Sequence, residues 1–170
     1  MDNKAQLHTL EGLGAAVMIT FSVLTITQGI TMMSPQNELS ITVQMEQISQ
    51  DALATLDIAQ HASAQYNLTE CIASWDMMEA KYPDNNLNNL DNSLAYLLPG
   101  VLYNVDIAYF KDENLNVKKV IVNGAPGKNA VVARHFVTLT NQTVQDMGGG
   151  WNLDDNELRV VEVRMTAWKV

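Results

Sequence analysis

One carboxylate stands at the edge of a long uncharged stretch, and this position limits the chemistry that it can do. Glu11 directly precedes residues 12–37, none of which carries a charged side chain. A carboxylate beside an apolar helix is costly unless it lies near a membrane interface or is paired with a cation. Glu11 therefore either forms an ion pair with a positive group or favours the positive end of its own helix.

Two asparagines carry a modification signal. Asn67 and Asn141 each begin an Asn-x-Thr sequon, the acceptor motif for N-linked glycans. Because the motif is short and common by chance, it indicates a glycan only where the asparagine lies at a surface. Thr69, the third residue of the first sequon, also suits the N-cap of a helix, so glycan and cap would be neighbours there.

The remaining reactive residues form no pattern typical of a metal centre or an active site. Cys71 is the single cysteine, which excludes an internal disulfide and a multi-thiolate zinc site, and we expect it to be a small buried residue. His61 and His135 have no partners at ligand spacing, and the oxygen-rich run 84–91 lacks the spaced acids of a calcium loop. No hydrolase, P-loop, zinc-protease or dinucleotide motif is present. We expect no cofactor, no metal and no enzymatic activity.

Composition and charge narrow the class of protein. The 170 residues suit one domain with an appendage, and an apolar share of 47% is too high for a disordered chain. Acids outnumber bases by 19 to 10, which gives a formal net charge of −9. A nucleic-acid binder needs a basic face for the phosphates, so no nucleic-acid partner is expected.

The apolar residues are concentrated near the N-terminus. As a helix, residues 12–33 would span about 33 Å, close to the hydrocarbon thickness of a bilayer. Small residues in this stretch recur at spacings of four and seven, namely Gly12, Ala16, Thr20, Thr27 and Thr31. Such a stripe lets helix backbones approach closely in lipid, so we expect a membrane helix that packs against its own copies. One alternative is that the whole stretch is a buried helix of a soluble domain. The other is that it is a membrane helix in which the small residues are tolerated and have no packing role.

A second helix is predicted over about residues 38–66. Apolar residues recur there every three or four positions, at Ile41, Met45, Ile48, Ala52 and Leu56 among others. Pro35 lacks an N–H and would interrupt or kink a helix that continued from the apolar stretch. The sequence therefore predicts a long helical N-terminal half, apolar first and amphipathic afterwards.

Shorter helices and then strands are predicted beyond residue 66. A third helix is expected from a Thr69 cap to about Tyr82, and a short one from Asp91 or Asn92 to Leu98. Apolar residues alternate with polar ones over residues 101–110, 117–124, 131–139 and 158–168, which predicts four antiparallel strands. Met147 and the three glycines that follow it, residues 148–150, are expected to form a flexible loop. Helices followed by strands indicate an α+β fold.

The segment KAQLHTLEGLGAAVMITFSV resembles the start of archaeal type IV pilin-like proteins, which carry a class III signal peptide. In that family a membrane-embedded aspartyl peptidase removes a short leader, and the mature chain opens into an apolar helix with Glu at its fifth position. The resemblance implies cleavage between Gln6 and Leu7, which makes Glu11 the fifth residue. The new α-amine on Leu7 of a neighbouring copy is then a suitable partner for the Glu11 carboxylate.

Two segments of the second half carry a further resemblance. YNVDI in the first predicted strand and VVEVRMTAW in the last, together with the HTLE start, are similar to an uncharacterised archaeal family of membrane-anchored pilin-like proteins. This resemblance spans most of the chain and implies a membrane anchor with an α+β head.

These observations predict a type IV pilin-like α+β fold with three parts: a leader (1–6), an apolar membrane or filament-core helix (7–35) and an extracellular head with a small antiparallel sheet (36–170). The expected function is structural. A membrane-inserted precursor would be cut by a prepilin peptidase and would polymerise with its own copies, through an assembly platform, into an N-glycosylated cell-surface filament. The alternative is a monomeric or minor membrane-anchored surface protein whose head is a binding module.

Overall fold

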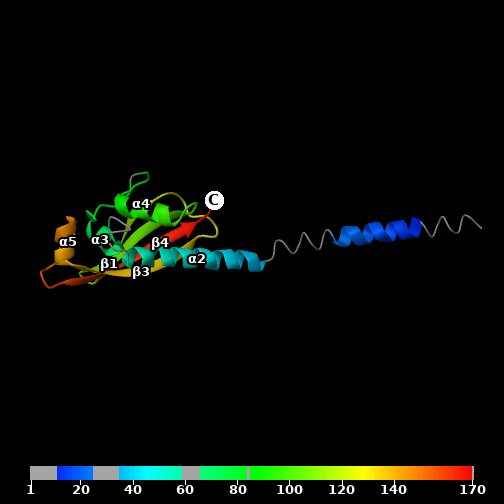
Figure 1. The fold of residues 1–170 in the computed structure, drawn as a ribbon. Helices are drawn as coiled ribbons and strands as arrows, with labels where there is room; N and C mark the ends of the chain where they lie inside the picture. Colours follow the sequence, from blue (N-terminus) through cyan, green and yellow to red (C-terminus); the bar gives the residue numbers. More distant parts are fainter. Residues whose placement is uncertain (1–10, 25–34, 59–65, 84, 170) are drawn as a thin grey trace, which may run out of the picture. The chain divides into compact units, whose positions relative to one another are not determined.

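A computed structural model describes residues 11–24, 35–58, 66–83 and 85–169 of the chain. The chain divides into two compact units, Met1–Ile41 and Thr42–Val170. Residues 11–24 of the first unit are helical. The second unit contains a sheet and its covering helices (Figure 1).

One antiparallel sheet organises the second unit. Its strands are β1 (Leu102–Lys111), β2 (Asn114–Val122), β3 (Val131–Thr140) and β4 (Leu158–Trp168), in the spatial order β2-β1-β4-β3. A two-residue turn joins β1 to β2, and both of its residues, Asp112 and Glu113, have positive φ angles as a type I′ turn requires. The expectation of an α+β fold with a four-stranded antiparallel sheet is confirmed.

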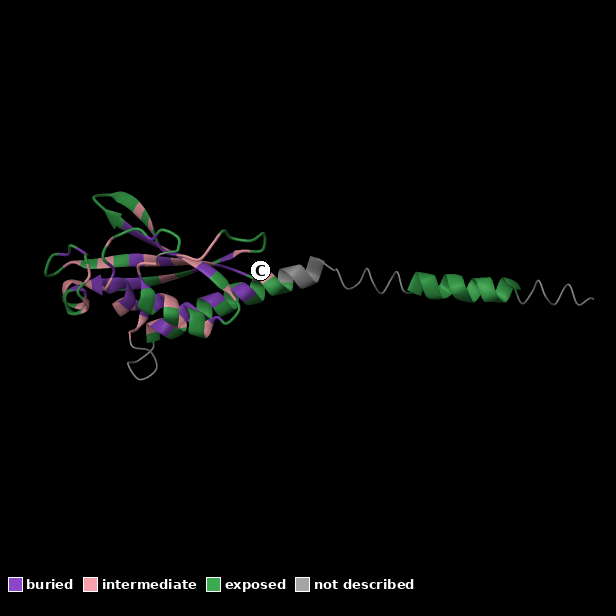
Figure 2. Cartoon of the chain, turned by 90° about the horizontal axis from the view of Figure 1, so that it is seen from above, coloured by how far each residue is buried: buried purple, intermediate pink, exposed green. Residues whose placement is uncertain are grey.

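Four helices accompany the sheet: α2 (Pro35–Ile58), α3 (Leu68–Ala73), α4 (Asn88–Leu97) and α5 (Asn141–Met147). From Thr42 onward, α2 lies along one side of the sheet, and both elements carry buried residues (Figure 2). Side chains from all four helices join one core with the side chains of that sheet face. Each fully buried Leu or Ile in such a core contributes about 1.5–3 kcal/mol.

The buried stripe of α2 differs from the predicted one. Met45, Ala52 and Leu56 are buried as expected, but Ile48 is 50% exposed and Ser49 is fully buried instead. The Ser49 hydroxyl has no hydrogen-bond partner among the described residues. The buried side of α2 therefore includes a small polar residue, which the spacing of apolar residues does not indicate. Residues 59–65 of the predicted helix lie outside the described part, and Tyr66 is not helical.

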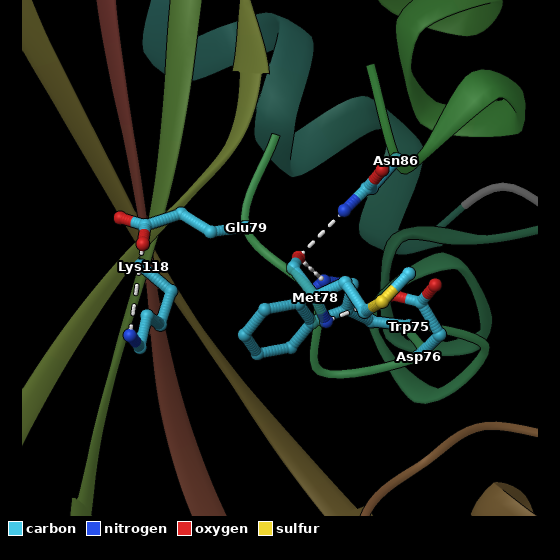
Figure 3. A network of polar contacts seen from close by, with 6 residues as sticks. All are labelled: Trp75, Asp76, Met78, Glu79, Asn86 and Lys118. Atoms are coloured by element: carbon cyan, nitrogen blue, oxygen red, sulfur yellow. Dashed lines mark hydrogen bonds and ion pairs between the residues drawn. The ribbon is translucent and has the colours of Figure 1, made fainter. Parts of the chain in front are cut away.

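The predicted third helix is mostly a loop. α3 ends at Ala73, and the indole Nε1 of Trp75 donates to the carbonyl of Met78 at 2.8 Å. The Asn86 amide donates to the same carbonyl, and the Met78 N–H donates to Asp76, so side chains hold the loop in place of helical hydrogen bonds (Figure 3). The prediction of a helix to Tyr82 is therefore wrong.

The short fourth helix also begins earlier than predicted. Its N-cap residue is Leu87, which makes no side-chain cap, and Asp91 lies inside the helix. The Asp91 carboxylate accepts hydrogen bonds from the Tyr103 hydroxyl and the Asn85 amide, both at 2.9 Å, and so ties α4 to the sheet. Burial, and then the Asp91 charge, raise the pKa of the Tyr103 phenol.

The glycine run before β4 is packed, contrary to the expectation of a flexible loop. Gly148 caps α5 in the left-handed conformation, with φ at 68°. A Cβ on Gly149 would lie 1.8 Å from the carbonyl oxygen of Ala73. The Gly150 N–H donates to the Trp75 carbonyl at 2.8 Å. These glycines allow a close approach between the loop and α3, which the third helix of the prediction would have obstructed.

Candidate functional site

The helix of residues 11–24 exposes its apolar side chains. Every residue from 11 to 24 is exposed, including Leu13 at 67%, Met18 at 75% and Ile19 at 64%. In the second unit, by contrast, the large apolar residues of α3 and α4 are mostly buried. A contiguous apolar surface of this kind marks contact with a protein partner or a lipid phase. No helix among the described residues is both long and apolar enough to cross a lipid bilayer.

Two hydroxyl groups of this helix are bonded within it. The Thr20 hydroxyl donates to the Ala16 carbonyl at 2.8 Å, and the Ser22 hydroxyl donates to the Met18 carbonyl at 2.9 Å. Both bonds reach back four residues, the arrangement by which hydroxyl groups are satisfied in a helix without water. The helix can therefore enter an apolar environment without leaving these two donors unbonded.

Three residues of the predicted packing stripe lie on this helix. Gly12, Ala16 and Thr20 are spaced by four and so share one side. A Cβ on Gly12 or Gly14 would meet nothing within 4 Å among the residues that the structure describes. Glu11 is the first described residue of this helix and is exposed. The other predicted residues, Gln6, Leu7, Thr27 and Thr31, lie outside the described part of the chain.

The first sequon lies at a helix cap. The Asn67 side-chain oxygen accepts from the Glu70 N–H at 2.8 Å, and the Glu70 carboxylate accepts from the Asn67 N–H at 2.9 Å. This reciprocal capping box makes Asn67 the N-cap of α3, so the predicted Thr69 cap is wrong. The oxygen that caps the helix is not the atom that carries a glycan, since glycans attach to the amide nitrogen. Asn67 is half-buried.

The second sequon opens α5, a helix that the sequence reasoning missed. Thr140 caps this helix, and its side-chain oxygen accepts from the Thr143 N–H at 3.1 Å. The Asn141 amide donates to Asp155 at 2.9 Å, so the acceptor nitrogen of this sequon is already bonded. The signal for α5 was the Thr-x-x-Thr spacing after a strand.

One histidine–carboxylate pair links α2 to the sheet. His135 Nε2 lies 3.0 Å from an Asp57 oxygen, and the Thr69 hydroxyl donates to the other oxygen at 3.2 Å. In a nucleophilic triad the histidine lies between the carboxylate and the hydroxyl. Here the carboxylate lies between the other two, so the arrangement joins elements and does not activate the hydroxyl. His61 lies outside the described residues.

Cys71 is buried in α3, as expected. Burial, with a smaller effect of Glu70, raises the pKa of its thiol to about 12, so little of it is the reactive thiolate at neutral pH. No cluster of three or more His, Cys, Asp and Glu side chains suited to a metal ion occurs among the residues that the structure describes.

The sheet face opposite the helices was not singled out from the sequence. It exposes Phe110, Leu115, Phe136 and Val160, each by more than half. We call this the outer face. A strand with only one covered face should be polar at every second residue. In β4 the neighbouring residues Val160 and Val161 are both apolar, although their side chains point to opposite faces, and this was the signal in the sequence.

Comparisons with known proteins match nearly the whole chain. Residues 4–167 match a family described as one of unknown function, DUF7288. A protein of Archaeoglobus fulgidus, described as uncharacterized, is 28% identical over 173 residues that cover 99% of this chain and 94% of that protein. No solved structure matches the chain. The family match extends over both compact units.

Proposed function

The chain belongs to the DUF7288 family, whose function is unknown, and we propose that it is a structural subunit of an extracellular type IV pilus-like filament. It would assemble through its apolar N-terminal helix after removal of residues 1–6. The observation that carries the proposal is the exposure of every residue from 11 to 24, which gives this described helix an apolar surface.

The chemistry of that helix favours a bundle of like helices. Transfer from lipid into a bundle keeps the apolar side chains out of water. The shared side of Gly12, Ala16 and Thr20 permits close backbone approach, and the bonded hydroxyl of Thr20 removes a cost of apolar burial. Among the described residues Gly12 and Gly14 have open space around them, which leaves room for the backbone of a neighbouring helix.

Glu11 supplies a means of setting the register between subunits. It lies at the first residue of the described helix and, after cleavage behind Gln6, would be the fifth residue of the mature chain. Its carboxylate would pair with the α-amine on Leu7 of a neighbouring copy. In an apolar core an unpaired charge is costly. Assembly is therefore favoured in the register that brings the carboxylate and the α-amine together.

The head supports the pilin-like arrangement at the level of architecture. An amphipathic helix lies along a small antiparallel sheet, and its N-terminal side continues toward the apolar segment in sequence. The precursor would be held in the membrane by the segment 7–35, cut by a prepilin peptidase and extracted by an assembly platform. N-glycans on Asn67 or Asn141 would coat the exposed heads.

Intact-mass and N-terminal analysis of material sheared from the cell surface tests the proposal. A chain that begins at Leu7 in a pelletable fraction would support leader removal and assembly. A chain that begins at Met1 and is found only in membranes would contradict it and would favour the alternative, a membrane-anchored surface protein whose head is a binding module. Visible filaments that lack this chain would also contradict it.

A further inference from the structure

The outer face of the sheet combines a charged row with an apolar band. The strand register aligns Arg134, Arg164, Asp106 and Lys119 in one row across all four strands. The next two rows toward the β1–β2 turn carry Phe136, Val117, Val160, Phe110 and Leu115, all of them 43% or more exposed. Glu162 lies among them as their single acid. The outer face is therefore apolar on one side and mostly basic on the other.

The basic groups of this row are incompletely satisfied by their own chain. Glu162 accepts from Arg164 at 2.5 Å and from Arg134 at 3.3 Å, so two guanidinium groups share one carboxylate. The Nε of Arg164 is buried and has no acceptor among the described residues. Arg134 remains 61% exposed. A chain whose net charge is −9 thus gathers positive charge on one sheet face.

A second surface of the same unit has the complementary character. Along α2, the residues that face away from the core recur at spacings of four and three and are all exposed: Gln44, Ile48, Asp51, Thr55 and Ile58. Ile48 is 50% and Ile58 79% exposed, and α2 contains no Lys or Arg. This surface, which we call the α2 stripe, carries two large apolar residues, one acid (Asp51) and no base.

The two surfaces cannot meet within one molecule. The opposite side of α2 packs on the inner face of the sheet through Met45, Leu53 and Leu56, and the outer face lies on the other side of that sheet. Both surfaces carry apolar groups, and their charges are opposite, since the outer face has bases and the α2 stripe has an acid. The outer face of one copy is therefore complementary to the α2 stripe of another.

From this complementarity we propose that the outer face of one subunit binds the α2 stripe of a second copy. The contact joins two different surfaces, so each bound subunit offers a free surface of each kind and the association continues without closing into a dimer. The inference rests on the proposed filament, because it describes how successive heads touch there. It adds a head-to-head contact to the packing of the N-terminal helices.

Cysteine cross-linking in the full-length chain tests the contact. Phe136→Cys and Ile48→Cys are combined in one chain, and pelleted filaments are treated with a short bifunctional thiol reagent. The thiol of Cys71 is buried, so it contributes no background. We expect a ladder of covalent oligomers larger than dimers. The control combines Phe136→Cys with Tyr96→Cys, because Tyr96 is 86% exposed on α4 and lies outside both surfaces.

Charge exchange gives an independent readout. Asp51→Arg and Arg134→Asp should each lower the amount of pelleted protein by about fivefold, and the two together should restore it. Arg134→Asp also removes the ion pair with Glu162 in its own chain. Asp51→Arg cannot restore that pair, because Asp51 lies on α2, so a rescue reports the contact between copies. Absence of rescue, or an equal ladder from the Tyr96 control, would overturn the contact.

The failure of this contact can be told apart from failure of the filament. Filaments that begin at Leu7 but give no ladder would overturn only the head contact. If the protein stays in membranes, the filament proposal fails. The same reagent is then applied to the membrane fraction, where a ladder would support the contact between heads and its absence would overturn that contact.

Discussion

The helix of residues 11–24 and the head from Thr42 onward treat their apolar residues in opposite ways. The head buries Trp75, Leu53 and Ile72 completely, and Trp75 packs edge-on against Trp151 with ring centroids 5.4 Å apart. The helix exposes every residue that it has. The head therefore carries its own stability in internal packing, whereas the described residues of the helix present an apolar surface of the kind that contacts a protein partner or a lipid phase.

This contrast implies that assembly and head stability are separable. Changes in the helix should alter filament formation and leave the unfolding of the head unchanged. Changes in the core should do the reverse. Each variant below is therefore measured in both ways, by the amount of pelleted protein and by denaturation of the detergent-solubilised full chain.

Glu11→Ala should have the largest effect. Loss of the carboxylate would leave the neighbouring α-amine unpaired in the helix core at a cost of about 3 kcal/mol, or roughly a hundredfold in assembly. The unfolding midpoint of the head should not move. Glu46→Ala is the matched control, because Glu46 is an exposed acid on α2 outside the apolar segment. Normal filaments from Glu11→Ala would remove the register role of this residue.

Gly149→Ala should destabilise the head by about 3 kcal/mol, because the new methyl group would overlap the Ala73 carbonyl and the backbone must shift. Gly148→Ala is the control one residue earlier. Position 148 has open space for a methyl group, and only its left-handed φ opposes a side chain. Gly148→Ala should therefore lower the free energy of unfolding by about 1 kcal/mol. Denaturant titration measures both, and equal losses would show that the close approach at Gly149 is unimportant.

Ala16→Leu should reduce pelleted protein by roughly fivefold, about 1 kcal/mol, by keeping neighbouring helices apart. Met18→Leu changes an exposed residue on the other side of the helix with little change in volume and should have no effect. The head should unfold identically in both variants. If the two variants assemble equally well, the small-residue stripe has no packing role.

Two carboxylates on the outer face should respond to pH with opposite signs. The hydrogen bond from Arg164 lowers the pKa of Glu162 from 4.5, so its contribution is present above that pH and is lost on acidification. Glu162→Gln should thus cost up to about 1 kcal/mol at pH 7 and little in acid.

Burial acts the other way on Asp106. Desolvation raises its pKa from 3.8, although Lys119 and Arg164 oppose the shift, so ionisation of this group lowers stability as the pH rises. Asp106→Asn should therefore stabilise the head at pH 7 and be neutral below pH 3.8. Thermal melts across this range check both carboxylates, and parallel curves for the two variants would contradict the opposite shifts.

The smallest effects concern the first sequon. Asn67→Ala should cost about 1 kcal/mol by removing the cap of α3, whereas Asn67→Asp keeps a capping oxygen and should change stability by only a few tenths. Both variants remove the glycan acceptor. A mass loss in Asn67→Asp without a change in unfolding would assign the glycan to this residue, and an unchanged mass would show that the site is unoccupied.

The sheet was predictable because its signals are local. Strands of alternating pattern and the turn at Asp112 and Glu113 lie in continuous segments, and each of the four strands appears within a few residues of its predicted bounds. The helix to Tyr82 failed because contacts distant in sequence override local propensity. The loop after Ala73 is held by Gly150 and by Asn86, and neither residue is close enough in sequence to enter a periodicity argument.

Only part of the candidate site could be predicted from the sequence. An uncharged stretch and the spacing of Gly12, Ala16 and Thr20 are visible in the sequence. The row of charges on the outer face is not, because Arg134, Arg164 and Asp106 come together only through strand register. The exposed stripe of α2 was equally hidden, since Ile48 looks like a core residue until Ser49 is found buried in its place.

The strand order has a consequence for biosynthesis. β4 pairs with both β1 and β3, while β1 and β3 do not pair with each other. As the chain emerges from the ribosome or crosses a membrane, β3 has no partner strand until β4 follows it. The head therefore cannot complete its sheet before β4 is available, so the last strand of the chain to be made is the one that joins the two others. Folding of the head is then timed by release of this final strand.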